Sequence, residues 1–226
     1  MIRVLTNDGL ESASIEALKA LGAEVINEHF EQDVLGEKLK DFDAIVIRSA
    51  TTLTSDVFKA EEGGKLKLAI RAGVGIDNID IPAGEAIGVT VRNTPSASSD
   101  SVAELAIGHM FALARFIAIS NYTMRNGEWN KKKYQGTEIA GKTLGIVGMG
   151  RIGQSLAKKA TALGMTVIYY TIEGKHDDLD YDFVSLEEVL KTSDFISLHV
   201  PYDKAAGSLI GKKELELMKN TAYVIN

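Results

Sequence analysis

The sequence predicts an α/β protein with two parallel-sheet domains, and three observations lead to this fold class. Short runs of β-branched and other apolar residues alternate with amphipathic helical stretches along the whole chain. Strands separated by helices of about ten to fifteen residues are typical of βαβ units, whose strands pair in parallel. A segment rich in hydroxyl residues, 93–101, divides the series in two, and a glycine-rich turn at 148–153 follows the first strand of the second part.

The elements of the first part follow from their periodicity. The run 2–6 reads as a strand, and Ile15, Leu18 and Leu21 then mark one face of a helix that stops at Gly22. The other strands predicted in this part are 43–48, 67–71 and 88–92, and further helices are predicted near 33–40, 55–62 and 80–87.

The stretch "NTPSASSDS" at 93–101 is the clearest boundary, because a proline is followed there mostly by hydroxyl and acidic residues. Its end can cap one long apolar helix over 102–119. We therefore expect domains at 1–97 and 98–226. Ser185 and Glu188 have the spacing of a capping box at the start of another helix. The strands predicted in the second domain lie near 144–148, 166–170, 195–199 and 222–225.

Composition excludes several classes of function. The chain has 226 residues, a net charge of −6 and no cysteine, so we expect neither a disulfide framework, nor a thiol nucleophile, nor a thiolate metal site. The negative charge argues against nonspecific nucleic-acid binding. No apolar run is long enough for a membrane span, and Met1 leads directly into a strand-like run. We expect a cytoplasmic protein with a small-molecule substrate and with no nucleic-acid, membrane or metal partner.

A glycine-rich turn carries the strongest local signal. Gly148, Gly150 and Gly153 have G-x-G-x-x-G spacing between a predicted strand and a predicted helix. In dinucleotide-binding domains the first glycine permits the tight turn, the second lets the backbone approach the pyrophosphate, and the third lets the helix pack closely on the strand. The helix N-terminus adds free N–H groups and a partial positive charge. The stretch therefore predicts a dinucleotide site.

The stretch "VIYYTIEG" at 167–174 lacks the acidic residue that normally holds the ribose about 20 residues after the turn. Thr171 stands in that place, with Glu173 two residues later. NADP would need an arginine for its 2′-phosphate, and the nearby cationic candidates are only Lys175 and His176. Glu173 would repel that phosphate, so we predict NAD as the cofactor.

Several stretches then occur in a characteristic order along nearly the whole chain. They are "VIRSATTLT" (46–54), "IRAGVGIDNID" (70–80), "NTPSASSDSVAEL" (93–105), "RNGEWNKKKYQGTEIAGKTLGIVGMGRIG" (125–153) and "SDFISLHVP" (193–201). Together they resemble the D-isomer-specific 2-hydroxyacid dehydrogenases, above all the members that act on 3-phosphoglycerate. The resemblance implies a flavodoxin-like substrate-binding domain followed by an NAD-binding Rossmann domain that is incomplete in this chain. It also implies oxidation of 3-phosphoglycerate to 3-phosphohydroxypyruvate, a step of serine biosynthesis.

The resemblance also implies which residues bind. The turn "RAGVG" would present the N–H groups of Val74 and Gly75 to the substrate carboxylate, and glycines around a valine leave the backbone free to form such an anion-binding nest. Arg48 would receive the distal phosphate, assisted by Arg71. The implied substrate-binding residues are Arg48, Ser49, Arg71, Gly73, Val74 and Gly75. The implied cofactor-binding residues are Val74, Gly148, Gly150, Arg151, Ile152, Gly153, Thr171, Val200 and Pro201.

Catalysis is expected to need residues outside this sequence. The family uses an arginine, a glutamate and a histidine, and the resemblance places all three beyond Asn226. His199 could act as an acid or base near neutral pH, but the histidine of "HVP" is structural in this family. We therefore expect no catalytic residue in this chain, no turnover by a polypeptide ending at Asn226, and a homodimer as the assembly.

Two other functions remain open on the sequence. One is a noncatalytic NAD-binding regulatory protein on the same scaffold, which the low net basicity and the lack of an added interaction segment disfavour. The other is the same enzyme class acting on glyoxylate, hydroxypyruvate or another small 2-oxo acid. The continuation of the natural sequence would distinguish the enzyme from the regulatory protein.

Overall fold

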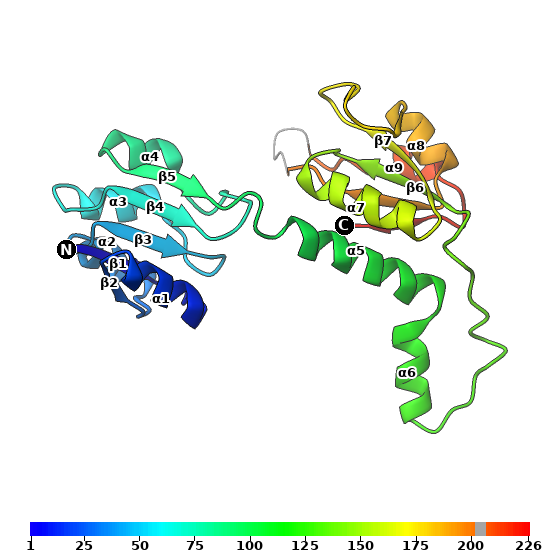
Figure 1. The fold of residues 1–226 in the computed structure, drawn as a ribbon, viewed down its shortest axis with the longest axis horizontal. Coiled ribbons are helices and arrows are strands. Elements are labelled where there is room, and N and C mark those ends of the chain that lie inside the picture. Colours follow the sequence, from blue (N-terminus) through cyan, green and yellow to red (C-terminus); the bar gives the residue numbers. More distant parts are fainter. Residues whose placement is uncertain (202–206) are drawn as a thin grey trace. The chain divides into compact units, whose positions relative to one another are not determined.

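The computed structural model describes residues 1–201 and 207–226. The chain forms two compact units, Met1–Ser98 and Ser99–Asn226 (Figure 1). The sequence prediction puts this division between residues 97 and 98. Each unit contains a five-stranded sheet covered by helices, which confirms the predicted α/β class.

The first unit has a parallel sheet in the order β2-β1-β3-β4-β5. This is the flavodoxin-like order, whose reversal point lies between β1 and β3. The sequence pattern does not predict β2, because Glu24 interrupts its short apolar run and no residue of this edge strand is fully buried. The strands are β1 (Ile2–Thr6), β2 (Ala23–Ile26), β3 (Ala44–Ile47), β4 (Leu68–Arg71) and β5 (Thr90–Asn93).

Both faces of the first sheet are apolar, because β3 is buried at every position. On one face Ile45 and Ile47 pack with Leu35, Leu39 and Phe58 from two of the helices. Side-chain caps from Thr54 and Asp80 fix the starts of two helices. The helices of this unit are α1 (Ser12–Ala20), α2 (Gln32–Leu39), α3 (Ser55–Glu61) and α4 (Ile81–Ala86).

The second unit has a parallel sheet in the order β10-β9-β6-β7-β8. These are the first five strands of a Rossmann sheet in their usual arrangement, and the strand order reverses between β6 and β9. The sequence pattern does not predict β8, which has only two residues. The strands are β6 (Thr143–Val147), β7 (Thr166–Tyr170), β8 (Asp182–Phe183), β9 (Phe195–Leu198) and β10 (Tyr223–Ile225).

Small residues bring two helices of this unit close together on one face of the sheet. The buried alanines 103 and 106 of one helix and 157 and 160 of the other belong to the same apolar cluster as Leu144 and Ile146 of β6, and Figure 1 shows α5 beside α7. Val189 and Leu190 pack on the other face. The helices are α5 (Ser99–Ala114), α6 (Ile117–Arg125), α7 (Arg151–Ala162), α8 (Leu186–Thr192) and α9 (Lys212–Leu217).

The predicted single helix over 102–119 is wrong, because the structure has two helices, α5 and α6, that meet at 60°. Phe116 between them has a left-handed φ of +56°, a conformation in which an α-helix cannot continue. The backbone at Gly136 and Thr137 crosses the end of α5, where the N–H of Thr137 donates to the carbonyl of Ala114 at 2.9 Å. A distant segment therefore ends this helix.

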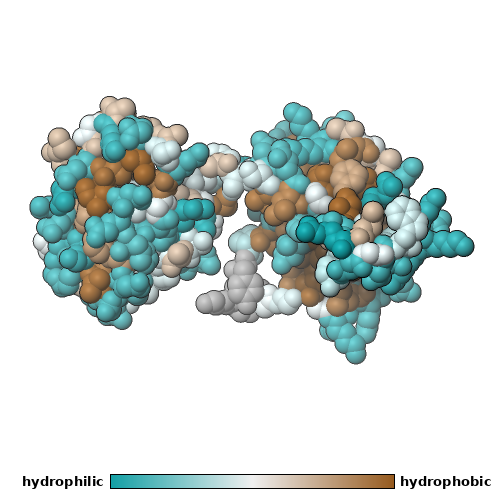
Figure 2. Space-filling model, turned by 90° about the horizontal axis from the view of Figure 1, so that it is seen from below, coloured by the Kyte–Doolittle hydropathy of each residue, from teal (hydrophilic) through white to brown (hydrophobic). Residues whose placement is uncertain are grey.

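Apolar residues reach the surface of both units among polar ones (Figure 2). Within the described residues no single helix is long and apolar enough to cross a membrane. Taken together, the bent pair α5 and α6 has the length and apolar composition of a span. The large exposed side chains of this pair include Leu105, Leu113, Ile117, Ile119, Tyr122 and Met124.

Candidate functional site

The glycine-rich turn follows β6 at the carboxyl edge of the second sheet. Gly148 has a φ of +95°, which L-residues rarely adopt, and a Cβ there would overlap the carbonyl oxygen of His199. Its N–H donates to the carbonyl of Tyr170 at 2.8 Å. Gly148 therefore fits tightly between the ends of β7 and β9, as the first glycine of a dinucleotide fingerprint must.

The other two glycines have different surroundings. A Cβ at Gly153 would overlap the carbonyl oxygen of Gly148, so the missing side chain lets α7 approach the turn. Gly150 has an ordinary φ of −75° as the N-cap of α7, and a Cβ there would meet no protein atom within 4 Å. Neither strain nor packing explains this glycine. A close approach of a ligand to its backbone does explain it.

The first turn of α7 provides the anion-binding groups. Arg151, Ile152 and Gly153 begin this helix, and the N–H groups of a first helical turn have no partner within the helix. They carry the positive end of the helix dipole. The predicted residues Arg151 and Ile152 therefore lie where a pyrophosphate would be bound.

The end of β7 lies beside this turn and carries a carboxylate. Thr171 follows β7 and is buried, and its hydroxyl donates to Glu173. Gly174, with a φ of +88°, closes a turn in which its N–H donates to the carbonyl of Thr171 at 3.3 Å. The hydrogen bond from Thr171 lowers the pKa of Glu173. Position 171 has no carboxylate, but the turn places the carboxylate of Glu173 next to Thr171 at the end of β7.

The segment after β9 borders the turn on its other side. Val200 is partly exposed and follows His199. Its Cγ1 would lie 2.9 Å from a Cβ added at Gly148, so the Val200 side chain packs next to the turn. Pro201 is the last described residue before the gap. The Nε2 of His199 lies 2.9 Å from the hydroxyl of the fully buried Ser197. Burial lowers the pKa of His199 and so favours the neutral form of its ring.

The predicted substrate residues gather at the carboxyl edge of the first sheet. Arg48 directly follows β3 and is exposed, and Arg71 ends the neighbouring strand β4, opposite Ile47 in the register. The Nε of Arg71 is buried and has no hydrogen-bond partner among the described residues. Ser49 is exposed next to Arg48. Two guanidinium groups therefore start from adjacent strand ends.

The turn 73–75 follows Arg71 and is held by contacts with Arg71 and with residues 93 and 94. The guanidinium of Arg71 fills the space that a Cβ of Gly73 would need. The carbonyl of Gly73 accepts from the N–H of Thr94 at 3.1 Å, and the carbonyl of Val74 accepts from the side chain of Asn93 at 2.6 Å. Within 1–201 and 207–226 the structure shows no acceptor for the N–H groups of Val74 or Gly75. The turn thus has its carbonyls bound and two donors available, as an anion site requires.

Sequence reasoning missed two residues of this edge, Asp8 and Asn78. Both contact the turn 48–51 that carries Arg48. A signal was present for Asp8, because "NDG" directly follows β1 and the carboxyl ends of parallel strands share one edge. Asn78 lies in the stretch "IRAGVGIDNID", one of those that resemble the family. The local sequence does not indicate that its side chain bonds to the turn 48–51.

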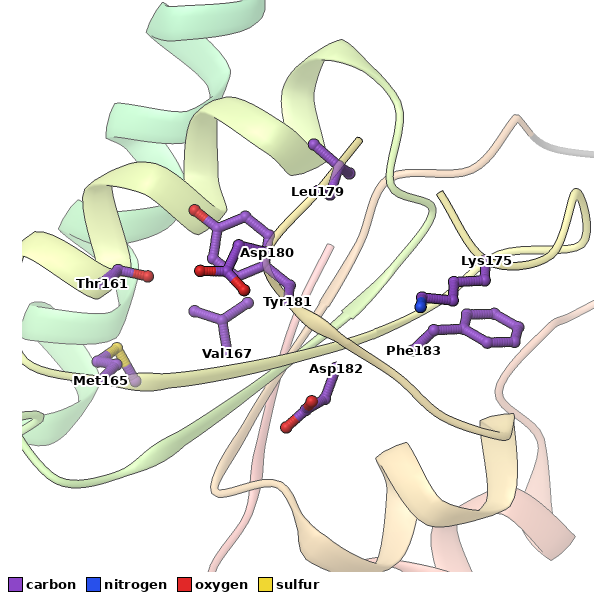
Figure 3. Close-up of a pocket in the computed structure, with 9 residues that line it drawn as sticks. All are labelled: Thr161, Met165, Val167, Lys175, Leu179, Asp180, Tyr181, Asp182 and Phe183. Carbon is purple, nitrogen blue, oxygen red and sulfur yellow. The ribbon is translucent and has the colours of Figure 1, made fainter. Parts of the chain in front are cut away.

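A cavity of about 630 Å³ lies elsewhere in the second unit (Figure 3). Met165, directly before β7, and Val167 within β7 line it together with Thr161 near the end of α7. Its charged lining residues are Lys175, Asp180 and Asp182, a net negative set that is unsuited to a phosphate, and it contains none of the predicted site residues. The glycine-rich turn is the better dinucleotide site on both charge and geometry.

Comparison with known proteins identifies what this arrangement is similar to. The family described as "D-isomer specific 2-hydroxyacid dehydrogenase, NAD binding domain" matches residues 107–226, which include the glycine-rich turn and the ends of β7 and β9. This match supports NAD as the cofactor.

Curated relatives cover the whole chain. A hydroxypyruvate reductase of Thermotoga maritima is 42% identical over 99% of this chain and 73% of its own length. A D-3-phosphoglycerate dehydrogenase of Methanocaldococcus jannaschii is 40% identical over 100% of this chain and 44% of its own length. The chain thus spans between two fifths and three quarters of the length of these relatives.

A solved structure agrees with the fold. An acyclic imino acid reductase in complex with NADPH and D-Arg superposes with a TM-score of 0.87 at 28% identity, over 100% of this chain and 74% of that one. That complex contains NADPH, which belongs to the same class of nicotinamide dinucleotides as the NAD predicted for this chain.

Proposed function

Because this chain belongs to the D-isomer-specific 2-hydroxyacid dehydrogenase family, we propose that it acts in the NAD-dependent oxidation of 3-phosphoglycerate to 3-phosphohydroxypyruvate. In this reaction the nicotinamide of NAD accepts the hydride from C2 of the substrate, and the hydroxyl group loses a proton. The described residues support the binding and orientation of both reactants.

The second unit holds the dinucleotide. The N–H groups at the start of α7 bind the pyrophosphate, and Gly150 lets it approach the backbone. Glu173 accepts hydrogen bonds from the ribose hydroxyls at the end of β7, and Val200 and Pro201 border the nicotinamide side. These groups position the cofactor without taking part in proton transfer.

The first unit binds the two anionic groups of the substrate. The observation that carries this proposal is the pair of arginines at the adjacent ends of β3 and β4, next to a turn with two available N–H groups. The turn binds the carboxylate through Val74 and Gly75, while Arg48 and Arg71 bind the phosphate. An arginine matches phosphate oxygens with parallel donors.

A second candidate substrate is hydroxypyruvate, because one of the relatives reported above is a hydroxypyruvate reductase. Hydroxypyruvate carries one anionic group, which the turn 73–75 alone would satisfy. It leaves the buried Nε of Arg71 and the exposed Arg48 without a function, so the arginine pair favours the phosphorylated substrate.

Removal of either arginine is expected to weaken phosphate binding selectively. A charge-assisted hydrogen bond contributes about 1.5–3 kcal/mol, so Arg48→Ala and Arg71→Ala should each weaken binding of 3-phosphoglycerate by roughly 10- to 150-fold. Binding of D-glycerate, which lacks the phosphate, should change by less than about threefold. Calorimetric titrations in the presence of NADH measure both constants.

Arg92→Ala is the matched control, because Arg92 is exposed within β5 and its side chain contacts the neighbouring carbonyl of Val91. Equal affinity of the parent chain for 3-phosphoglycerate and D-glycerate would contradict the proposed substrate. It would favour hydroxypyruvate or another acid without a phosphate.

The carboxylate of Glu173 is expected to select NAD over NADP. Glu173→Gln replaces a charged acceptor by a neutral one, so NAD should bind about fivefold more weakly. NADP should bind more tightly than to the parent, because the repulsion of its 2′-phosphate is removed. Calorimetry with both dinucleotides measures the ratio, and Glu187→Gln, an exposed glutamate bonded to Lys191, is the control. An unchanged ratio would mean that another group binds the ribose.

A further inference from the structure

The turn 48–51, which carries Arg48, is held by two side chains from other parts of the first unit. The carboxylate of Asp8 accepts from the N–H of Arg48 at 2.6 Å and from the N–H of Thr51 at 3.1 Å. It also accepts from the hydroxyl of Thr51. Burial alone would raise the pKa of Asp8, but these hydrogen bonds outweigh it and the pKa lies below its ordinary value.

Asn78 binds the opposite polar groups of the same turn. Its side-chain amide donates to the carbonyl of Arg48 at 2.8 Å and to the carbonyl of Thr51 at 2.7 Å. Asp8 and Asn78 thus satisfy the N–H and the C=O of both terminal residues of the turn. Arg48, Ser49 and Ala50 are exposed, so water could satisfy the backbone groups of Arg48. Thr51 is buried, so its N–H and C=O need partners from the protein.

Asn78 also connects this turn to the anion-binding turn. Its backbone carbonyl accepts from the N–H of Leu53 at 2.9 Å, and the N–H of Asp80 donates to the carbonyl of Leu53 at 2.8 Å. Leu53 and Ile79 form an isolated parallel bridge. The segment 73–80 therefore carries Val74 and Gly75 at one end and fixes the Arg48 turn at the other.

We propose that Asp8 and Asn78 are positioning residues that set the Arg48 turn at a fixed distance from the turn 73–75, so that one substrate can reach both. This proposal rests on the proposed function. The two turns receive the two anionic groups of one small molecule, and a loose Arg48 turn would have to be ordered each time a ligand binds. Ordering a long side chain and its turn costs affinity.

The sign of the effect separates positioning from simple electrostatics. Asp8→Asn removes a negative charge next to the phosphate site, so Coulomb attraction alone would tighten binding of 3-phosphoglycerate. Positioning predicts the opposite, because the new amide cannot accept all the hydrogen bonds that the carboxylate receives. We expect Asp8→Asn and Asn78→Ala each to weaken 3-phosphoglycerate about five- to tenfold.

The experiment measures calorimetric affinities of the full chain for 3-phosphoglycerate, D-glycerate and NAD. The preference for 3-phosphoglycerate over D-glycerate should fall in both variants. NAD affinity, which depends mainly on the glycine-rich turn and on Glu173 in the second unit, should stay at the parent value. Asp56→Asn is the control, because it removes the same charge from the same unit. Among the described residues, this exposed carboxylate forms its ion pair with Lys59. The circular dichroism of each variant shows whether it is folded. If Asn78→Ala does not fold, Asn78→Ser takes its place.

Failure of this inference differs from failure of the proposed function. A parent chain without preference for 3-phosphoglycerate would contradict the function and the inference together. A parent chain with that preference, and variants that keep it or bind 3-phosphoglycerate more tightly, would overturn the positioning role and leave the function intact.

Discussion

A Gly150→Ala variant is expected to fold like the parent chain and to lose most of its NAD affinity. Alanine accepts the φ of −75° at this position, and its Cβ would meet no protein atom within 4 Å. Alanine is a poorer N-cap than glycine, but the unfolding temperature should stay within roughly 4 °C of the parent. The methyl group would stand where the pyrophosphate approaches the backbone. Loss of one charge-assisted hydrogen bond there corresponds to about 1.5–3 kcal/mol, or roughly 10- to 150-fold in affinity.

Calorimetric titration with NAD and a thermal melt of the same sample check this expectation. Gly127 follows α6, but Gly127→Ala is not a suitable control. Its φ of +81° would strain an alanine and destabilise the fold. Gly108→Ala is suitable, since it lies within α5 and a Cβ there also meets no atom within 4 Å. Parent-like NAD affinity of Gly150→Ala would mean that the pyrophosphate is bound elsewhere.

A Gly148→Ala variant is expected to be destabilised before any ligand is added. Its φ of +95° is strained for alanine, and the new Cβ would overlap the carbonyl oxygen of His199. Strain of this kind costs about 1–3 kcal/mol, and the overlap with backbone adds to it. The unfolding transition of the second unit should therefore move down by at least roughly 5 °C.

Comparison of the Gly148→Ala and Gly150→Ala variants separates structure from binding within one turn. We expect the first variant mainly to lower the melting temperature and the second mainly to lower NAD affinity, with a melting temperature close to that of the parent. A melt of Gly148→Ala that coincides with the parent would show that the turn differs in solution from the one described.

The parts of the fold that the sequence predicts are those with a local physical cause. Apolar runs predict the central strands, because β3 and β6 are buried almost throughout. The edge strands β2 and β8 are short and half-exposed and leave no such pattern. The bend at Phe116 depends on the backbone at Gly136 crossing the end of α5, which no local pattern reveals.

The same distinction applies to the site. The glycine-rich turn is contained in six consecutive residues, and its glycines have the surroundings that their spacing predicts. Arg48 and Arg71 follow from the resemblance to a family. The contacts of Asp8 and Asn78 join residues 40 and 30 positions away from Arg48, so only a folded structure brings them together. The role proposed for Glu173 depends on the turn closed by Gly174, which places a carboxylate at the end of β7.

The most direct test of the dinucleotide site is amide NMR of the isotope-labelled chain during a titration with NAD. We expect the amide signals of Gly150, Arg151, Ile152 and Glu173 all to shift during the titration and to give the same dissociation constant for NAD. The signals of Met165 and Asp180, which line the separate cavity of Figure 3, should stay in place. Shifts confined to Met165, Asp180 and their neighbours, with the glycine-rich turn unaffected, would contradict the assignment of NAD to the N-terminus of α7.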